Sequence, residues 1–289
     1  MRGLRKYLTP FAPDQSGAVS VLYELGGIIV ICDAGGCTGN VCGFDEPRWF
    51  ERKSAVFSAG LRDMDAILGR DDRLVAKLVD AADKIDANFA AIVGTPVPAV
   101  IGTDYQALKR MCEKKTDLPI LAIDTDGMEL YDKGEEKAYL ALFTAFAKEK
   151  YEVCKEKVGI LGMTPQDVSD LKAADKVREE LKKEGKGKNT CYFRLNYGLE
   201  AVERASEVGK NIVVSAAALE VAKYLEKTFG TPYEIGYPAA GELVPNLDYQ
   251  GKKILVVHQQ GMAEAIRQEI LKRENSAEVQ TATWFMRKK

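Results

Sequence analysis

Three cysteines lie five residues apart where an apolar run of the chain gives way to a glycine-rich stretch. They are Cys32, Cys37 and Cys42. Thiolates are the ligands of iron–sulfur clusters and of many zinc sites. We therefore expect these three cysteines to be ligands of a metal cluster.

Packing is the alternative, and it is strongest for Cys32, because this residue closes an apolar run and free cysteine is often buried. Cys37 and Cys42 lie between small or polar residues, where packing gives little reason for a thiol. Three thiolates do not complete a four-ligand site, so a fourth ligand must come from elsewhere in the chain, from a second copy, or from another kind of group. The spacing matches no standard zinc finger, zinc ribbon or bacterial ferredoxin pattern.

The cysteine segment follows a predicted strand. Residues 28–31 are four β-branched residues in a row, as in a buried strand of a parallel sheet. The loop then lies at the carboxyl end of that strand, which is where open α/β sheets bind ligands. Gly35, Gly36 and Gly39 are predicted to bind the cofactor by letting the backbone fold closely around it.

Composition narrows the classes of protein. The chain has 289 residues, 46% of them hydrophobic, and 41 basic and 43 acidic residues give a net charge of -2. This balance gives no electrostatic reason to expect nucleic acid or an anionic membrane as a partner. No signal peptide and no window of about 18 apolar residues is found, so a cytoplasmic protein with no membrane contact is expected. Six cysteines without a secreted disulfide pattern fit reduced thiols.

Predicted strands alternate with predicted helices along the chain. The strands are 28–31, 89–93, 118–123, 158–162, 190–195, 211–215, 253–258 and 279–285. The helices are 74–87, 105–114, 135–157, 165–184, 198–208, 217–229 and 261–271, and 47–63 is predicted to be irregular or helical. This alternation predicts an α/β fold with parallel sheets and right-handed crossovers. We expect two Rossmann-like domains, 1–155 with the cysteine loop and 156–289.

Four segments carry a resemblance to one known family. They are 13–18 with the run to 33–37, then 69–74 (GRDDRL), 94–104 (GTPVPAVIGTD) and 229–232 (FGTP). In this order they resemble the component-1 proteins of the nitrogenase superfamily, which includes subunits of light-independent protochlorophyllide reductase. The resemblance places Cys37 on the family's cluster cysteine in its H-G-P-x-G-C segment and Cys32 on its histidine.

The chain departs from the family at two ligand positions. Pro13 stands where the family has its first cluster cysteine, and Thr95 stands where it has the cysteine of its C-P loop. Cys32 and Cys42 are additions that could rebuild a ligand set locally. Family members carry three α/β domains, and this chain ends about 35 residues into the third, so a truncated third domain is expected.

The resemblance implies an iron–sulfur redox protein with a 4Fe–4S cluster, which accepts low-potential electrons and reduces an unknown substrate. A non-catalytic cluster carrier or assembly scaffold, or a fold that binds no metal, remains open. The family implies a homodimer or a paralogous subunit sharing the cluster. No Walker A or G-x-G-x-x-G sequence occurs, so an ATP-dependent reductase would be a separate partner.

Several other residues have a functional and a structural interpretation. His258 follows a strand and could donate a proton or bind a metal, yet a structural turn is favoured. Asp104 is expected to cap a helix rather than act in acid–base chemistry, and Asp124 and Asp126 to form a turn rather than a calcium loop. Packing is favoured for Cys112, Cys154 and Cys191. Residues 19–25 and 49–50 could line a dimer interface but fit a core better.

Overall fold

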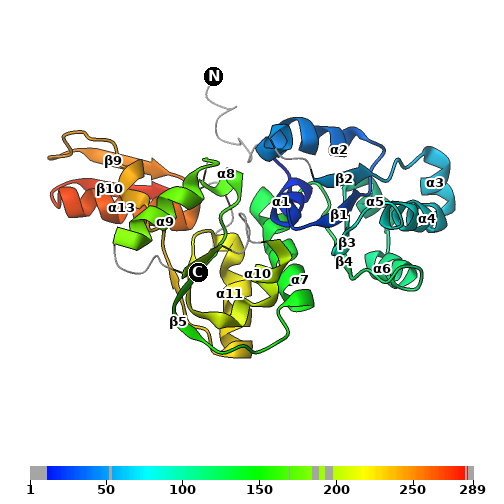
Figure 1. Ribbon diagram of the computed structural model, residues 1–289. Helices are drawn as coiled ribbons and strands as arrows, with labels where there is room; N and C mark the ends of the chain where they lie inside the picture. The colour runs from blue at the N-terminus through cyan, green and yellow to red at the C-terminus, as the bar shows by residue number, and fades with distance from the viewer. Residues whose placement is uncertain are drawn as a thin grey trace, which may run out of the picture. The chain divides into compact units, whose positions relative to one another are not determined.

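The computed structural model describes residues 12–51, 54–168, 170–183, 189–192, 198–283 and 285, with only the backbone course described at 189–192. The chain divides into two compact units, Met1–Lys148 and Glu149–Lys289. Each is an α/β unit with a parallel sheet of four strands (Figure 1). The predicted α/β fold with two Rossmann-like domains is confirmed. No described helix is both long enough and apolar enough to span a membrane.

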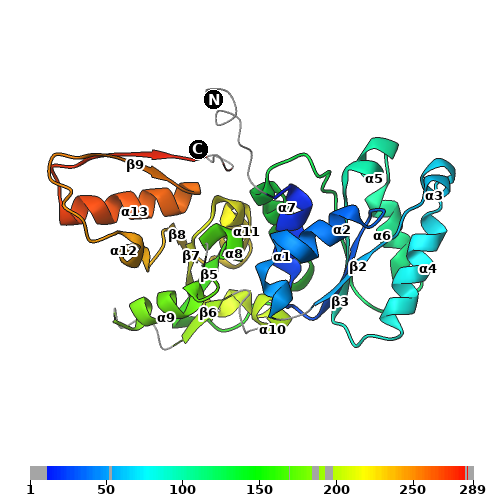
Figure 2. The same cartoon turned by 90° about the horizontal axis from the view of Figure 1, so that it is seen from above.

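The first unit holds one sheet between two helical layers. Its strands pair in parallel in the order β2-β1-β3-β4. Helices α4 and α6 lie on one side of the sheet and α1 and α7 on the other (Figure 2). The elements are α1 (Asp14–Leu22), β1 (Gly27–Ile31), α2 (Gly36–Asn40), the π-helix η2 (Val41–Asp45), the 3-10 helix η3 (Pro47–Phe50), β2 (Ala55–Ser58), α3 (Asp63–Leu68), α4 (Asp71–Ala82), β3 (Phe89–Val93), α5 (Pro96–Ile101), α6 (Tyr105–Glu113), β4 (Ile120–Ile123) and α7 (Tyr131–Phe146).

The two central strands of this sheet form its core. Every residue of β1 and of β3 is buried, as expected for strands covered on both faces. Ile28 and Val30 of β1 pack with Leu74 and Leu78 of α4 on one face. The strand that carries the cysteine loop is therefore held on both sides by neighbouring strands and on both faces by helices.

The second unit repeats this strand order. Its sheet runs β6-β5-β7-β8, all in parallel, and a separate parallel pair is formed by β9 and β10. Helix α9 packs on one face of the larger sheet through Ala174, Val177 and Leu181. The elements are β5 (Cys154–Leu161), α8 (Pro165–Val168), α9 (Ala173–Lys183), β6 (Asn189–Tyr192), α10 (Gly198–Glu203), η4 (Ala205–Glu207), β7 (Val208–Val213), η5 (Ala216–Ala218), α11 (Leu219–Phe229), β8 (Tyr233–Ile235), α12 (Ala240–Leu243), β9 (Lys253–Val257), α13 (Gln260–Arg273) and β10 (Glu278–Ala282).

Some predicted elements differ from the structure. The segment 47–63 contains the strand β2, whose four residues are too few to show a periodic pattern. The predicted helix 135–157 ends at Phe146, and the predicted helix 165–184 is two helices, α8 and α9. The predicted strand 190–195 is β6 as far as Tyr192, and the rest lies outside the described residues.

Candidate metal-binding and redox site

Asp33 organises the backbone that follows β1. Its side chain is 2% exposed and accepts hydrogen bonds from the Thr38 backbone N–H (2.7 Å), the Thr38 hydroxyl (2.9 Å) and the Ser58 hydroxyl (2.6 Å). These bonds tie the start of α2 to the end of β2. Gly35 lies in the turn at a φ of 117°, which an L side chain rarely adopts. A buried carboxylate and one glycine thus fix the path of the cysteine loop.

Cys32 lies in the core and not in the loop. Its thiol is 1% exposed and belongs to the apolar cluster that contains Leu74 and Cys112. Burial, together with the negative charges of Asp33 and Asp71, raises the pKa of Cys32 to about 12. A neutral, buried thiol is what packing predicts, so the structure favours the packing interpretation for this residue.

Cys37 and Cys42 lie on consecutive helical turns after the glycine turn. Cys37 is on α2 and Cys42 on the π-helix η2, and both side chains are half-buried. Burial raises the pKa of each thiol, and the Asp33 carboxylate adds to the rise in both; Glu46 adds further to that of Cys42. Since Asp33 acts on both, the two thiols share one electrostatic neighbourhood. A metal would have to displace their protons on binding.

The π-helix is held against α1 by buried polar groups. The Glu46 N–H donates to the Val41 carbonyl at 2.9 Å, which is the i to i+5 bond of a π turn. The Asp45 carboxylate accepts from the Ser16 hydroxyl and from the Asn40 side chain, both at 2.7 Å. Single π turns inside helices occur often at functional sites. Here the turn positions Cys42.

Arg48 fastens the far end of this segment. Its guanidinium is 3% exposed, donates to both Glu46 carboxylate oxygens at 2.6 Å, and reaches the Ser20 carbonyl at 2.8 Å. Glu24 lies 3.3 Å away, and the guanidinium stacks over the Tyr23 ring at 4.6 Å from its centre. The pKa of Arg48 is raised by its bond to Glu46 against the effect of burial. The cysteine segment is therefore rigidly attached.

Two aromatic side chains beside the thiols face solvent. Phe44 is 82% exposed and Phe50 is 77% exposed, while Trp49 is half-buried. By contrast, Val19 and Leu22 of α1 are fully buried in the unit's core. The predicted interface candidates thus separate, with 19–25 largely in the core and Phe50 on the surface next to the cysteine loop.

The loop after β3 lies against the loop after β1. The Thr95 hydroxyl donates to the Cys32 carbonyl at 2.6 Å, and the Thr125 hydroxyl donates to the Gly94 carbonyl at 2.8 Å. Thr95 is 1% exposed. The position at which the family carries a cluster cysteine therefore lies next to the cysteine loop, and in this chain it holds a hydrogen-bonded hydroxyl.

A cavity of about 270 Å³ opens at the same sheet edge, with Cys32 in its wall. Asp71 and Asp104 also line it, and burial together with the charges of Asp72 and Asp104 raises the pKa of Asp71. Gly69 and Gly102 complete two of its turns. The carboxyl edge of the first sheet thus offers both a thiol-bearing surface and an acidic cavity.

The thiols of one chain do not form a complete site. Among the described residues, no three histidine, cysteine, aspartate or glutamate side chains are arranged to hold a metal ion. Cys37 and Cys42 are accessible on one helical segment, whereas Cys32 is in the core. A Cβ atom at Gly36 or Gly39 would meet nothing within 4 Å, so no close backbone approach requires these glycines. The residues fit half of a four-thiolate site, and a second copy of the loop would supply the other half.

The remaining candidates have structural partners. Asp104 accepts from the Ala107 N–H at 2.9 Å and caps α6, and Asp126 accepts from two following backbone N–H groups in a turn. The His258 Nδ1 accepts from the Gln259 N–H at 2.9 Å. Cys112 is buried, as predicted, but Cys154 is exposed, so packing does not explain it. The side chain of Cys191 lies outside the described residues.

Sequence reasoning missed Asp33, Asp45 and Arg48, the residues that position the loop. Asp33 had a visible signal, because an aspartate directly after a buried strand and five residues before Thr38 is placed to cap a helix. Asp45 and Arg48 had none, since their partners Ser16 and Ser20 lie on α1, far away in the sequence.

The family model "Nitrogenase component 1 type Oxidoreductase" matches residues 15–239. Two solved structures share the fold over almost the whole chain. "Nitrogenase Cp1 at pH 6.5" aligns with a TM-score of 0.69 and 16% identity over 97% of this chain and 62% of that one. "Nitrogenase Cp1 at pH 5" aligns with a TM-score of 0.72 and 15% identity over 99% of this chain and 67% of that one. The chain thus spans about two thirds of their length, and no curated protein matches it.

Proposed function

Because this chain belongs to the nitrogenase component 1 type oxidoreductase family, we propose that it is an iron–sulfur redox protein. Cys37 and Cys42 of two copies of the chain hold one 4Fe–4S cluster at a dimer interface. The single observation that carries the proposal is the pair of accessible thiols on one rigid helical segment at the carboxyl end of β1. Cys32 remains a core residue in this proposal.

The surroundings of the thiols support a shared site. Phe44 and Phe50 expose large apolar rings next to Cys42, and such rings are enriched in protein interfaces. Two copies meeting through this surface would bring four thiols together, as a four-thiolate cluster requires. The exposed rings give a dimer an energetic reason to form at the same place.

The chain's own residues would set the properties of the site. A bound cluster supplies one-electron redox chemistry. Asp33 and Glu46 place negative charge near the thiols, which favours the oxidised form and so a low reduction potential. Arg48 and Asp45 keep the segment fixed on α1. Electrons would arrive from a separate ATP-dependent reductase, and the substrate would be reduced near this edge of the sheet.

A carrier of preformed clusters is the second candidate. Its specific support is that the two thiols are half-exposed and lie at the surface, where a cluster could be handed on. A redox protein retains its cluster through reduction and reoxidation, whereas a carrier transfers it to an acceptor protein. Spectra recorded during a dithionite cycle, and then during incubation with an apo-ferredoxin, separate the two.

The test is metal analysis of protein purified without oxygen. We expect about four iron and four sulfide per dimer, a paramagnetic signal on reduction, and a dimer by light scattering. Cys37→Ser and Cys42→Ser should each abolish the iron and sulfide. Cys154→Ser, which removes an exposed thiol of the second unit, is the matched control and should retain both. Iron-free protein after reconstitution would reject the proposal.

A further inference from the structure

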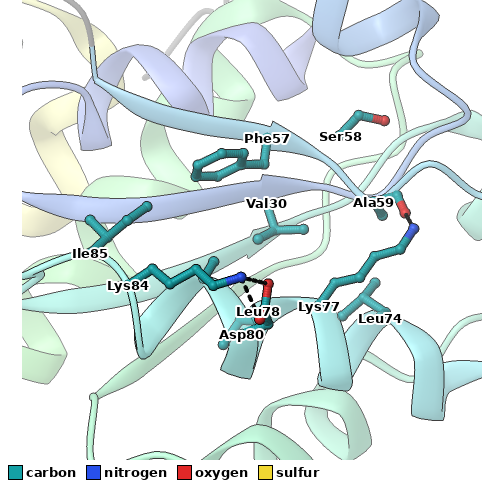
Figure 3. Close-up of a pocket in the computed structure, with 11 residues that line it drawn as sticks. Val30, Phe57, Ser58, Ala59, Leu74, Lys77, Leu78, Asp80, Lys84 and Ile85 are labelled. Atoms are coloured by element: carbon teal, nitrogen blue, oxygen red, sulfur yellow. Dashed lines mark hydrogen bonds and ion pairs between the residues drawn. The ribbon is translucent and has the colours of Figure 1, made fainter.

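A second cavity lies under the edge strand β2, between this strand and helix α4 (Figure 3). Its volume is about 300 Å³, within the range of small-molecule sites. Val30 and Phe57 are paired in register on β1 and β2 and form its roof, and Leu74 and Leu78 of α4 form its floor. Helix α4 does not cover β2 fully, since Phe57 is still 40% exposed.

The cavity carries two lysines with different charge balance. The Lys84 ammonium lies 2.7 Å from the Asp80 carboxylate, so its charge is neutralised. The Lys77 ammonium donates to the Ala59 main-chain carbonyl, which is a neutral acceptor. No carboxylate partner of Lys77 is found in the described part of the chain. One end of an apolar cavity thus holds a cation without a counter-charge.

We propose that this cavity binds a small apolar molecule that carries one carboxylate, such as an aromatic or short aliphatic acid. The apolar part lies between Phe57 and Leu78, and the carboxylate pairs with Lys77. Lys77 has two further N–H donors for it beyond the bond to Ala59. The lysine stem covers the apolar wall while its ammonium stays at the rim. This site is independent of the cysteines and of any cluster they hold.

Titration calorimetry of the apo-protein with benzoate, phenylacetate and hexanoate tests the proposal, with benzamide as a neutral analogue. At least one of the acids should bind saturably at millimolar concentration or below, and at least about tenfold more tightly than benzamide when benzoate is the binder. NMR shifts of Phe57 and Leu78 should accompany binding. No saturable binding by any of the acids would overturn the proposal, and so would equal affinity for benzoate and benzamide.

Variants locate the charge that is recognised. Lys77→Met keeps the apolar stem and should weaken carboxylate binding at least about tenfold, while benzamide binding stays unchanged. Lys84→Met, whose lysine is already neutralised by Asp80, is the matched control and should change carboxylate affinity less than about threefold. Phe57→Ser should weaken both ligands, because it removes the roof. An unchanged carboxylate affinity in Lys77→Met protein would reject the assigned binding mode.

Discussion

The two units use the same strand order but finish their first strands differently. After β1, Asp33 caps a short helix that leaves Cys37 and Cys42 half-exposed. After β5, Thr164 and Asp167 cap each other's backbone at 3.3 Å, and both side chains are buried, at 0% and 2% exposure. One sheet edge is open and bears thiols, and the other is closed by a capping pair.

The difference shows where function is encoded in this fold. The sheets supply the same geometric edge in both units, because parallel strands end together there. Only the residues after the first strand decide whether the edge offers ligands or seals itself. Chemistry therefore belongs to the loop of the first unit, and structure to that of the second.

Thiol accessibility is the largest expected difference. In the apo-protein Cys37 should react with iodoacetamide at least about a thousandfold faster than Cys32, because a core thiol reacts only when the unit opens. Peptide mass spectrometry over a time course measures both rates. The exposed Cys154 sets the unhindered rate. If Cys32 is labelled as quickly as Cys37, the separation of core and loop thiols is wrong.

Removal of the Arg48 guanidinium should cost the open edge most of its rigidity. Arg48→Met leaves Glu46 buried without its main cation, which we expect to lower the free energy of unfolding by about 3–5 kcal/mol. Urea denaturation measures the change. Arg70→Met is the matched control, because Arg70 pairs with Asp72 on an exposed surface, and it should leave the midpoint unchanged. Equal effects would show that the buried pair does not anchor the segment.

The two glycine turns should tolerate alanine differently. Gly162 has a φ of 81°, and a Cβ there would lie 2.8 Å from the backbone nitrogen of Ser215. Gly35 is also left-handed, but the nearest atom to its Cβ would be the Ser58 Oγ at 4.0 Å. Gly162→Ala should therefore cost about 2 kcal/mol more than Gly35→Ala, because overpacking adds to the backbone strain. Urea unfolding with hydrogen exchange assigns each loss to its unit, and a smaller cost at Gly162 would contradict the closed edge.

Strongly periodic or apolar elements could be predicted from the sequence. β1 and β3 announce themselves as short apolar runs, and α6 through its capping aspartate and amphipathic pattern. Helix α1 was missed, because all nine of its residues are buried and no polar face marks it. β2 was missed because an edge strand of four residues is stabilised by pairing with β1, which is a tertiary contact.

The candidate site could be predicted only in part. Residue type and position after a strand were enough to select the cysteine loop. They could not separate Cys32 from Cys37, since its burial depends on packing with α4 and α6, which lie about 40 to 80 residues further along the chain. The π turn at Val41–Asp45 was equally hidden, because it depends on the bond from Ser16 to Asp45. Long-range contacts decided both.

Titration of His258 is the smallest expected effect and concerns the edge of the second unit. His258 follows β9 and is the chain's only histidine, and burial lowers its pKa below the usual 6.5. The folded state then binds fewer protons than the unfolded state, so its contribution to stability is present above pH 6.5 and is lost as the pH falls through the lowered pKa. The single imidazole Cε1–H signal in NMR gives this pKa directly. His258→Asn keeps an acceptor for the Gln259 N–H and should remove the loss of stability on acidification from the urea midpoints. A pKa at or above 6.5 would show that this edge is as open to water as the cysteine loop.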